Sequence, residues 1–432
     1  MIKNTIVKCN FCEEKIFLRF QLGCFDIPFD FYCPNCGVSV SGALYVSKNH
    51  FIVKNALEIE EDIKNVKFYG NFSTEFLNKK ISEFSTLEDI VNDGFSPFMS
   101  TMVLFENDGR YMKIINNVGN FYRFKKETWI NLIPLYELFF NYKLNLIKKP
   151  LLKFSQNYII KNELDAMISL HQLTLLGMNF IMPANTLYDY IEISKKIFEK
   201  NNLEKTFEFI SFLKEKIKLN SLSEKVIEIY KKWIVDFEKY MAVIILSMGE
   251  KNELVDRKSF GISTINFEDM KSFFVNSYEL ILELITLPIG LNNIILRNHY
   301  DNFSEESCYK NFKTYFEQSK FNRLKSLVKD EPYSKYLDMN RHIRNSIAHY
   351  DYKLNKQTQI ITFFDKYGKN TETIEMYLFD FALLCYENIK VIIYMNELLY
   401  NIRKLDFIKK GIKSNINPNF KKINIVENEL CI

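Results

Sequence analysis

Apolar residues recur every three or four positions through much of the chain, which is the spacing of one buried face of an α-helix. This pattern dominates from about residue 128 to residue 249 and returns from about residue 266 to residue 403. In the second stretch it predicts helices over about residues 267–286 and 306–329, another from about 332 onward, and a long one over 377–403. Pro288 and Gly290 are expected to break or kink the chain after the first of these helices. The pattern therefore predicts a mainly α protein.

Strand-like patterns occupy shorter segments. Apolar positions alternate weakly in Ile16–Phe20, which indicates a short strand. Residues 41–124 have mixed periodicity, and a turn sequence at Glu106–Arg110 predicts a hairpin between the apolar runs on either side of it. A second hairpin is expected to pair residues 359–364 with residues 371–375. Asn266, with an aspartate three residues later, is a candidate N-cap for the helix that follows.

The cysteines are concentrated near the N-terminus, where four of them form two CxxC pairs separated by 20 residues. A CxxC turn directs two thiolates at one ion, and two such turns complete a tetrahedron. Gly37 follows the second pair, at a position that often needs a positive φ. The pattern predicts a zinc ribbon whose structural Zn2+ is bound by Cys9, Cys12, Cys33 and Cys36. Because the protein supplies all four ligands, no coordination position is left for catalysis.

The composition is that of a folded protein. Of 432 residues, 47% are hydrophobic and 25% are charged, with only 13 Gly and 9 Pro, which excludes disordered and collagen-like chains. The net charge of +4 is compatible with nucleic-acid binding but does not demonstrate it. The longest apolar stretch, about residues 280–296, is interrupted by Glu283 and Pro288, and the N-terminus lacks the apolar core of a signal peptide. We therefore expect a cytoplasmic protein without a membrane segment.

Other chemically reactive side chains are expected to have structural roles. Cys24 lies off the CxxC pattern as a spare thiol, whereas Cys308 and Cys385 are expected to be small buried residues. The isolated histidines are interpreted as ordinary core or surface residues; they are His50, His171 and His299. The sequence contains no GxxxxGK[ST], HExxH or GxSxG motif, which argues against a P-loop nucleotidase, a zincin and an ordinary serine hydrolase.

One predicted helix carries an unusual set of polar residues, in the sequence Asp338–Tyr352. When successive residues are placed about 100° apart, four of them share the core-facing stripe: Met339, Ile343, Ile347 and Tyr350. Four polar residues fall on roughly the opposite face: Arg341, Asn345, His349 and Tyr352. Arg344 lies on the flank. Such a polar face is either solvated or presented to a partner.

The segment Arg344–His349 matches the R-x4-6-H signature of the HEPN superfamily, in the common form with Asn directly after Arg. Its position near the end of a helical unit that a long helix closes also fits that family. The resemblance covers about residues 266–403, which is near a third of the chain. With a separate N-terminal zinc ribbon, the chain resembles bacterial HEPN proteins of the abortive-infection and toxin type.

The resemblance implies a metal-independent endoribonuclease in which two copies of the motif face each other across one cleft. Arg344 and His349 are then expected to act on RNA, with Asn345 orienting the phosphate or a motif side chain. A histidine can transfer protons at the 2′-hydroxyl, and a guanidinium can stabilise charge on the phosphate. Expected products carry a 2′,3′-cyclic phosphate and a 5′-hydroxyl, and DNA should resist cleavage. The implied partners are RNA, a second copy bound through the C-terminal bundle, and a phage or protein trigger.

Two alternatives remain open for this motif. The polar residues can form an ordinary solvated helix face, or the family fold can be inactive and serve only for binding. The chain would then be a non-catalytic nucleic-acid-binding or adaptor protein that uses its zinc ribbon, with the bundle as a dimerisation module. Glu279 and Glu283 are possible sources of a carboxylate near the motif, but the sequence does not align either securely.

The expected architecture combines these segments in one mainly α chain. Its parts are a zinc ribbon over 1–45, a small mixed α/β region over 46–125, a helical middle domain over 126–255, a HEPN-like helical bundle over 262–405 and a tail over 406–432.

Overall fold

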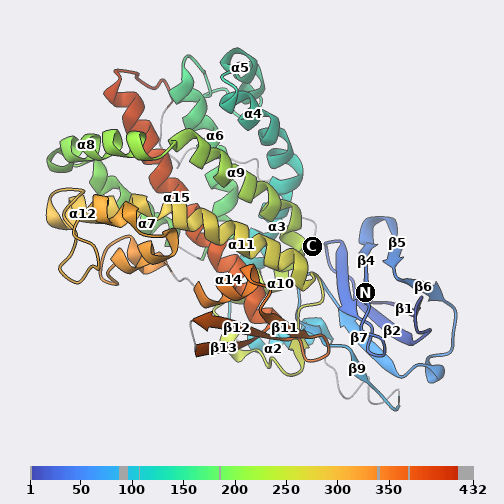
Figure 1. The fold of residues 1–432 in the computed structure, drawn as a ribbon. Helices are drawn as coiled ribbons and strands as arrows, with labels where there is room; N and C mark the ends of the chain where they lie inside the picture. The colour runs from blue at the N-terminus through green and yellow to red at the C-terminus, as the bar shows by residue number, and fades with distance from the viewer. Residues whose placement is uncertain are drawn as a thin grey trace. The chain divides into compact units, whose positions relative to one another are not determined.

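The computed structural model describes residues 2–86, 96–106, 108–183, 186–337, 341–367 and 370–416. The fold is mainly α with several small sheets, as the apolar spacing predicts (Figure 1). The chain forms two compact units, each drawn from segments far apart in the sequence. Unit 1 comprises residues 1–118, 232–281 and 338–391, and unit 2 comprises residues 119–231, 282–337 and 392–432. The contiguous domain boundaries expected from the sequence remain a prediction.

Unit 1 begins with two small sheets. The first has the order β6-β1-β2-β7-β9, in which β2 and β7 are parallel and the other pairs antiparallel. Its strands are β1 (Ile2–Cys9), β2 (Lys15–Gln21), β6 (Ala56–Ile59), β7 (Phe68–Phe72) and β9 (Ser82–Glu83). The second is an antiparallel sheet of β3 (Ile27–Tyr32), β4 (Ser39–Tyr45) and β5 (His50–Lys54). Both sheets contribute to one core, where Phe20, Phe29 and Phe72 pack together with ring centroids 5.3–5.8 Å apart.

The hairpin predicted around Glu106–Arg110 is wrong. The chain turns there, but the flanking segments are the helices α2 (Pro97–Leu104) and α3 (Arg110–Arg123). Capping explains the outcome, because the Ser96 side chain accepts a hydrogen bond from the Met99 amide in the first turn of α2. In α3, Ile114, Val118 and Phe121 are buried at helical spacing. The apolar periodicity of this region was therefore too weak to predict the two helices.

The rest of unit 1 supports the motif helix. It contains α10 (Met241–Met248), most of α11 (Phe267–Leu284), α14 (Arg341–Ala348) and the first part of α15 (Leu378–Lys409). Between α14 and α15 lies an antiparallel sheet of β11 (Tyr352–Asn355), β12 (Ile360–Tyr367) and β13 (Asn370–Tyr377). A further two-stranded sheet joins β8 (Asn78–Lys79) to β10 (Phe260–Gly261). These elements place the motif helix between α11, which precedes it in the sequence, and a sheet that follows it.

Several sequence predictions in this region are confirmed. Asn266 caps α11 by accepting a hydrogen bond from the Asp269 amide at 2.8 Å. The hairpin expected at residues 359–375 is formed by β12 and β13, and the long closing helix is α15. Strand β11 was not predicted. Tyr352, expected on the polar face of the motif helix, lies in that strand instead, because the helix ends at Ala348.

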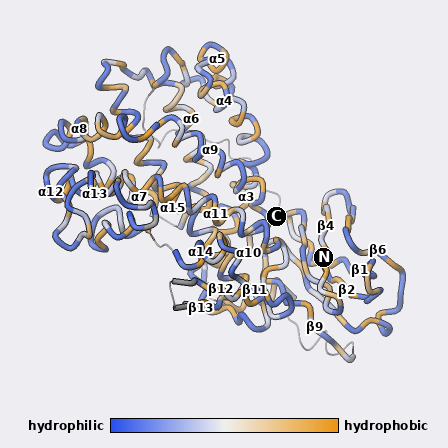
Figure 2. Tube along the Cα trace, viewed as in Figure 1, coloured by the Kyte–Doolittle hydropathy of each residue, from blue (hydrophilic) through white to orange (hydrophobic). Residues whose placement is uncertain are grey.

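Unit 2 consists mainly of helices (Figure 1). Along their traces hydrophobic and hydrophilic residues alternate turn by turn, as expected for helices with one buried face (Figure 2). The complete helices of this unit are α4 (Ile130–Phe140), α5 (Leu144–Leu152), α6 (Glu163–Asn179), α7 (Thr186–Lys195), α8 (Lys200–Lys216), α12 (Thr286–Arg297) and α13 (Phe312–Glu317). The boundaries between the two units fall within α3, α11, α15 and α9 (Leu219–Asp236).

Two helix predictions in unit 2 need correction. The break or kink expected at Pro288 and Gly290 occurs a few residues earlier than predicted: α11 ends at Leu284, and α12 begins at Thr286 with Pro288 in its first turn, where proline is tolerated. Gly290 has a packing role, since a Cβ there would come within 2.1 Å of the Phe209 ring. The helix predicted over residues 306–329 is also wrong, because only α13 and a 3-10 segment at Lys320–Ser326 are formed. Asn311 caps α13 from inside the predicted helix and so delays its start.

One helical stretch, Phe267–Arg297, is long and apolar enough to cross a membrane by length and composition alone. Within its most apolar window 78% of the residues are buried in the protein, as in the core helices of soluble proteins.

Candidate functional site

The four cysteines of the CxxC pairs converge at one end of the N-terminal sheets. The sulfur atoms of Cys9, Cys12, Cys33 and Cys36 all lie within 4.8 Å of one another. Two of the sulfur–sulfur distances are 3.7 Å, between Cys9 and Cys36, and 3.5 Å, between Cys12 and Cys33. A tetrahedron with metal–sulfur bonds of ~2.3 Å has edges of about 3.8 Å, so the cluster has the size that a tetrahedral ion requires. The cluster could therefore hold a metal ion.

Each pair is shaped by a tight turn after a strand. In the first turn the Glu13 amide donates to the Cys9 carbonyl, and in the second the Gly37 amide donates to the Cys33 carbonyl at 2.8 Å. Gly37 has φ +71°, as the sequence predicts, and Glu13 has φ +58° in the equivalent position. Burial raises the pKa of the Cys33 thiol to about 12. A divalent cation offsets that burial penalty and stabilises the thiolates.

The second cysteine turn also contacts the sheet that follows the motif helix. Lys356 Nζ donates to the Gly37 carbonyl at 2.7 Å, and Gln357 Nε2 donates to the Pro34 carbonyl at 3.0 Å. The Lys356 ammonium also lies 4.8 Å from the centre of the Tyr32 ring. Both donors belong to the turn between β11 and β12. The second cysteine turn is therefore hydrogen-bonded, within unit 1, to the sheet that follows the motif helix.

The motif helix α14 is fixed by two apolar residues and one ion pair. Ile343 and Ile347 are 0% and 5% exposed, which confirms the predicted core face at these positions. Met339, assigned to the same face, lies outside the described residues. Arg344 Nε donates to Glu279 Oε1 of α11 at 2.9 Å, and Nη2 contacts the same oxygen. Glu279, which the sequence could not align, is thus the carboxylate paired with the motif arginine.

The other two candidate residues lie along the same helix. Asn345 is half-buried, and its carbonyl accepts a hydrogen bond from the His349 amide at 3.0 Å. His349 is exposed just beyond the last residue of α14. The helix therefore brings together a guanidinium held by a carboxylate, a carboxamide and an exposed imidazole. Such a set can hold a phosphate and transfer a proton.

Tyr350 was predicted to lie on the core face, but its side chain is 81% exposed, so this prediction is wrong. The helix ends at Ala348, four residues before the end of the predicted helix, and the Asp351 amide donates to the Ser346 carbonyl at 2.8 Å. This closure places Tyr350 in the left-handed region with φ +58°, where glycine is favoured. The turned backbone carries the tyrosine side chain out into solvent.

We expect Tyr350→Gly to stabilise the protein by about 1 kcal/mol, because glycine removes the left-handed backbone strain of an exposed residue. The midpoint of urea unfolding measures this change. Tyr350→Ala is the matched control, since it removes the same ring but keeps a Cβ, and should give no gain. A glycine variant no more stable than the alanine variant would show that the positive φ of Tyr350 does not destabilise the fold.

A second polar side-chain pair of this helix was not predicted. His342 Nδ1 lies 2.6 Å from Asp365 Oδ2 of β12 and 3.3 Å from Glu372 Oε2 of β13. Asp365 and Glu372 are direct cross-strand partners in the hairpin of β12 and β13. The hairpin alone does not reveal that α14 packs on β12, so the pairing with His342 needed the tertiary structure.

One of these structural assignments is wrong, because Cys308 is exposed and not buried, whereas Cys385 is buried as predicted. His171 is a core residue of unit 2, as expected. Its Nε2 lies 2.8 Å from Glu397 Oε2, and its ring stacks on Tyr400 at 3.7 Å.

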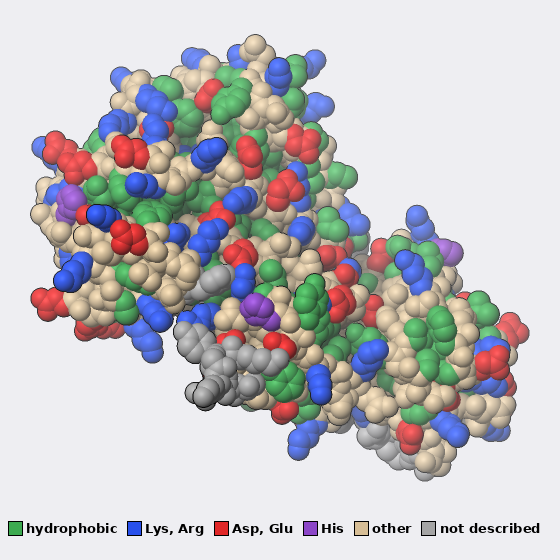
Figure 3. Space-filling model, viewed as in Figure 1, with side chains coloured by type: hydrophobic (Ala, Val, Ile, Leu, Met, Phe, Trp, Pro, Cys, Tyr) green, Lys and Arg blue, Asp and Glu red, His purple; other side chains and the backbone are tan. Residues whose placement is uncertain are grey.

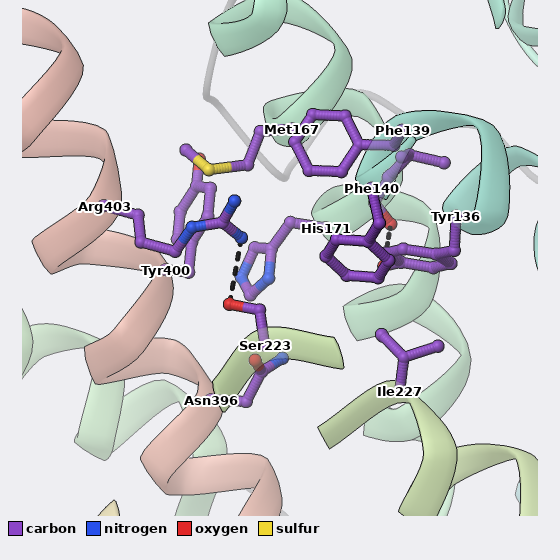
Figure 4. A pocket seen from close by; sticks show the side chains of 11 residues that line it. Tyr136, Phe139, Phe140, Met167, His171, Ser223, Ile227, Asn396, Tyr400 and Arg403 are labelled. Atoms are coloured by element: carbon purple, nitrogen blue, oxygen red, sulfur yellow. Dashed lines mark hydrogen bonds between the residues drawn. The ribbon is translucent and has the colours of Figure 1, made fainter. Parts of the chain in front are cut away.

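His171 is one of the residues that line a small pocket in unit 2, most of whose other large side chains are aromatic (Figure 4). Figure 4 shows the Arg403 guanidinium beside it, donating to the Ser223 hydroxyl at 3.0 Å. Burial lowers the pKa of Arg403 to about 10. The space inside is about 30 Å3, which is room for a water molecule or two. We therefore treat this pocket as part of the core packing of unit 2.

No family model, curated protein or solved structure matches the chain. The functional proposals therefore rest on the geometry of the site.

Proposed function

We propose that the protein is a metal-independent endoribonuclease of the HEPN type. The observation that carries the proposal is the arrangement on α14, where Arg344 is held by Glu279 and His349 is exposed at the helix end. Two buried isoleucines fix this helix, so the polar residues have a defined direction. A preorganised guanidinium and an accessible imidazole are the groups that phosphodiester transfer within RNA requires.

RNA supplies its own nucleophile for this reaction. The 2′-oxygen attacks the adjacent phosphorus, the bond to the 5′-oxygen breaks, and the products are a 2′,3′-cyclic phosphate and a 5′-hydroxyl. In the proposed site Arg344 stabilises negative charge on the phosphate oxygens, His349 transfers a proton, and Asn345 positions the phosphate or a neighbouring side chain. DNA lacks the 2′-hydroxyl and is expected to resist cleavage.

We further propose that two copies of the chain pair through the C-terminal bundle. Arg344 and His349 are about 140° apart around a helix, so one copy does not direct both at a small ligand. Two antiparallel copies of α14 can bring an arginine and a histidine from different molecules to one phosphate. A strictly monomeric protein that cleaves RNA through this motif would contradict the dimeric site.

The metal proposed for the cysteine cluster is Zn2+ in a structural role, within a zinc ribbon. Four thiolates at tetrahedral spacing are typical of closed zinc sites, in which no position is open to substrate.

The proposed setting is cytoplasmic, where the enzyme acts as an antiphage defence or toxin effector released by a phage or protein trigger. On the face shown in Figure 3 basic and acidic side chains are interspersed. The described side chains of that face therefore form no large positive patch that would attract RNA.

The proposal is tested with the full-length, zinc-loaded protein on single-stranded RNA and on DNA of the same sequence, with no Mg2+ or other free divalent cation added to the reaction. Cleavage of RNA alone, with cyclic phosphate ends identified by mass spectrometry, is the expected result. No cleavage, together with no growth arrest on overexpression, would favour the non-catalytic binding protein. Cleavage that requires added Mg2+ would contradict the metal-independent mechanism.

A further inference from the structure

His342 is held in one orientation by the hairpin packed against α14. Its Nδ1 faces Asp365, which is 7% exposed at the side chain, while Glu372 lies farther off and is 58% exposed. The short contact with a buried carboxylate favours a proton on Nδ1. In the neutral ring the lone pair is then on Nε2. The histidine side chain is 33% exposed, so it is not closed off within the core.

His342 shares one face of α14 with two residues of the proposed site. Asn345 follows it by three positions and His349 by seven, which brings all three to within about 60° around a helix. Seven residues correspond to about 10 Å along the axis, so the two imidazoles are two turns apart with Asn345 between them. Arg344 adjoins this face on the flank. In the antiparallel pair of α14 proposed above, His342 of one copy and His349 of the other can therefore lie on opposite sides of one phosphate.

This inference rests on the proposed ribonuclease function and completes its proton transfers. We propose that His342, positioned by Asp365, is the general base of the site, and that His349 is the general acid. His342 Nε2 takes the proton from the 2′-hydroxyl as the 2′-oxygen bonds to phosphorus. The bond from phosphorus to the 5′-oxygen breaks, and that oxygen takes a proton from protonated His349. One proton is taken up and one released, so no metal, oxidant or further reactant is needed.

A purely structural role for the pair predicts a different outcome, because His342–Asp365 also ties α14 to β12. His342→Asn separates the two roles. An asparagine Nδ2 can donate to Asp365 much as the ring Nδ1 does, so the tie is kept, but the amide cannot accept a proton at neutral pH. Asp365→Asn instead keeps the histidine and weakens the group that fixes its orientation and tautomer.

The experiment measures kcat, KM and thermal stability for the full-length, zinc-loaded variants on one RNA substrate. We expect His342→Asn to lower kcat by about 100-fold or more at unchanged KM and unchanged melting temperature. Asp365→Asn should lower kcat by at least about tenfold, and the double variant should be no worse than His342→Asn, because the two residues act as a unit. His50→Asn, at an exposed histidine in β5, is the matched control and should keep full activity.

The outcomes separate the two proposals. If His349→Ala abolishes cleavage while His342→Asn keeps the wild-type kcat, the role of His342 is overturned and the ribonuclease proposal stands. If His349→Ala cleaves RNA as well as the wild type, the ribonuclease site itself fails. If His342→Asn melts earlier than the wild type, His342→Gln is measured in the same way. Full activity in a glutamine variant of native stability likewise overturns the proposed role of His342 as the general base.

Discussion

His349→Ala is expected to lower RNA cleavage by about 100- to 10,000-fold, the range found when a proton-transferring side chain is removed. The loss should appear mainly in kcat, because the imidazole acts as charge develops on the leaving oxygen. His349 is exposed, so the alanine variant should melt within a few degrees of the wild type. Single-turnover cleavage of a labelled RNA measures the chemical step, and circular dichroism measures the fold.

Arg344 gives a matched test of the same site. Arg344→Ala removes the proposed phosphate-binding group and is expected to lower cleavage by about 100- to 1,000-fold. Arg344→Lys keeps the charge and an ion pair with Glu279 but loses the planar guanidinium, so it should recover only part of the activity. The double variant with His349→Ala should be little worse than either single change, because residues of one site are not additive. Cleavage that persists in both alanine variants would remove the basis for a HEPN-type site.

The second large effect concerns the metal. Cys33→Ser is expected to unfold the N-terminal sheets, because a structural zinc site contributes folding free energy of about 10 kcal/mol in small domains. Cys33 is buried at the end of β3, so a serine there also leaves a polar group without its ion. Zinc content by mass spectrometry and hydrogen exchange over residues 2–60 measure the loss. Cys24→Ser is the matched control, since Cys24 is exposed and off the cluster.

Metal removal also tests whether zinc takes part in the chemistry. We expect removal of the proposed zinc to unfold the N-terminal sheets without directly removing the proposed cleavage groups of the motif helix. Because Lys356 and Gln357 bind the second cysteine turn, faster exchange should extend to residues 352–360. A chelated protein that keeps its fold and its dimer but loses all cleavage would show that the metal does more than hold the structure.

Local sequence patterns predicted much of the candidate site. The CxxC spacing identified the four residues that the fold brings within 4.8 Å, because a short turn fixes both cysteines of a pair. Helical periodicity placed Ile343 and Ile347 in the core and left His349 exposed, since side-chain direction follows from position along a helix. The long closing helix and the hairpin before it were predicted for the same reason. Each of these features depends on neighbours within a few residues.

Where elements end was less predictable, because capping competes with periodicity. Ser96 caps a helix that extends into the run 102–105, which was predicted as a hairpin strand, and Asn311 delays a helix that apolar spacing would start earlier. Tyr350 followed the core stripe of α14 in the sequence, but the left-handed turn at the helix end exposes it. These differences came from single side-chain or backbone hydrogen bonds, which a periodic pattern does not contain.

The four cysteines, the mainly α class and the composition of the motif helix can be inferred from the order of the residues alone. The charged partners of that helix cannot, because the pairing of Arg344 with Glu279 and of His342 with Asp365 appears only in the folded chain. These partners are 65 and 23 residues apart along the chain. Their contact depends on how α11 and β12 pack against α14, and packing of distant elements is set by the whole core, not by local spacing.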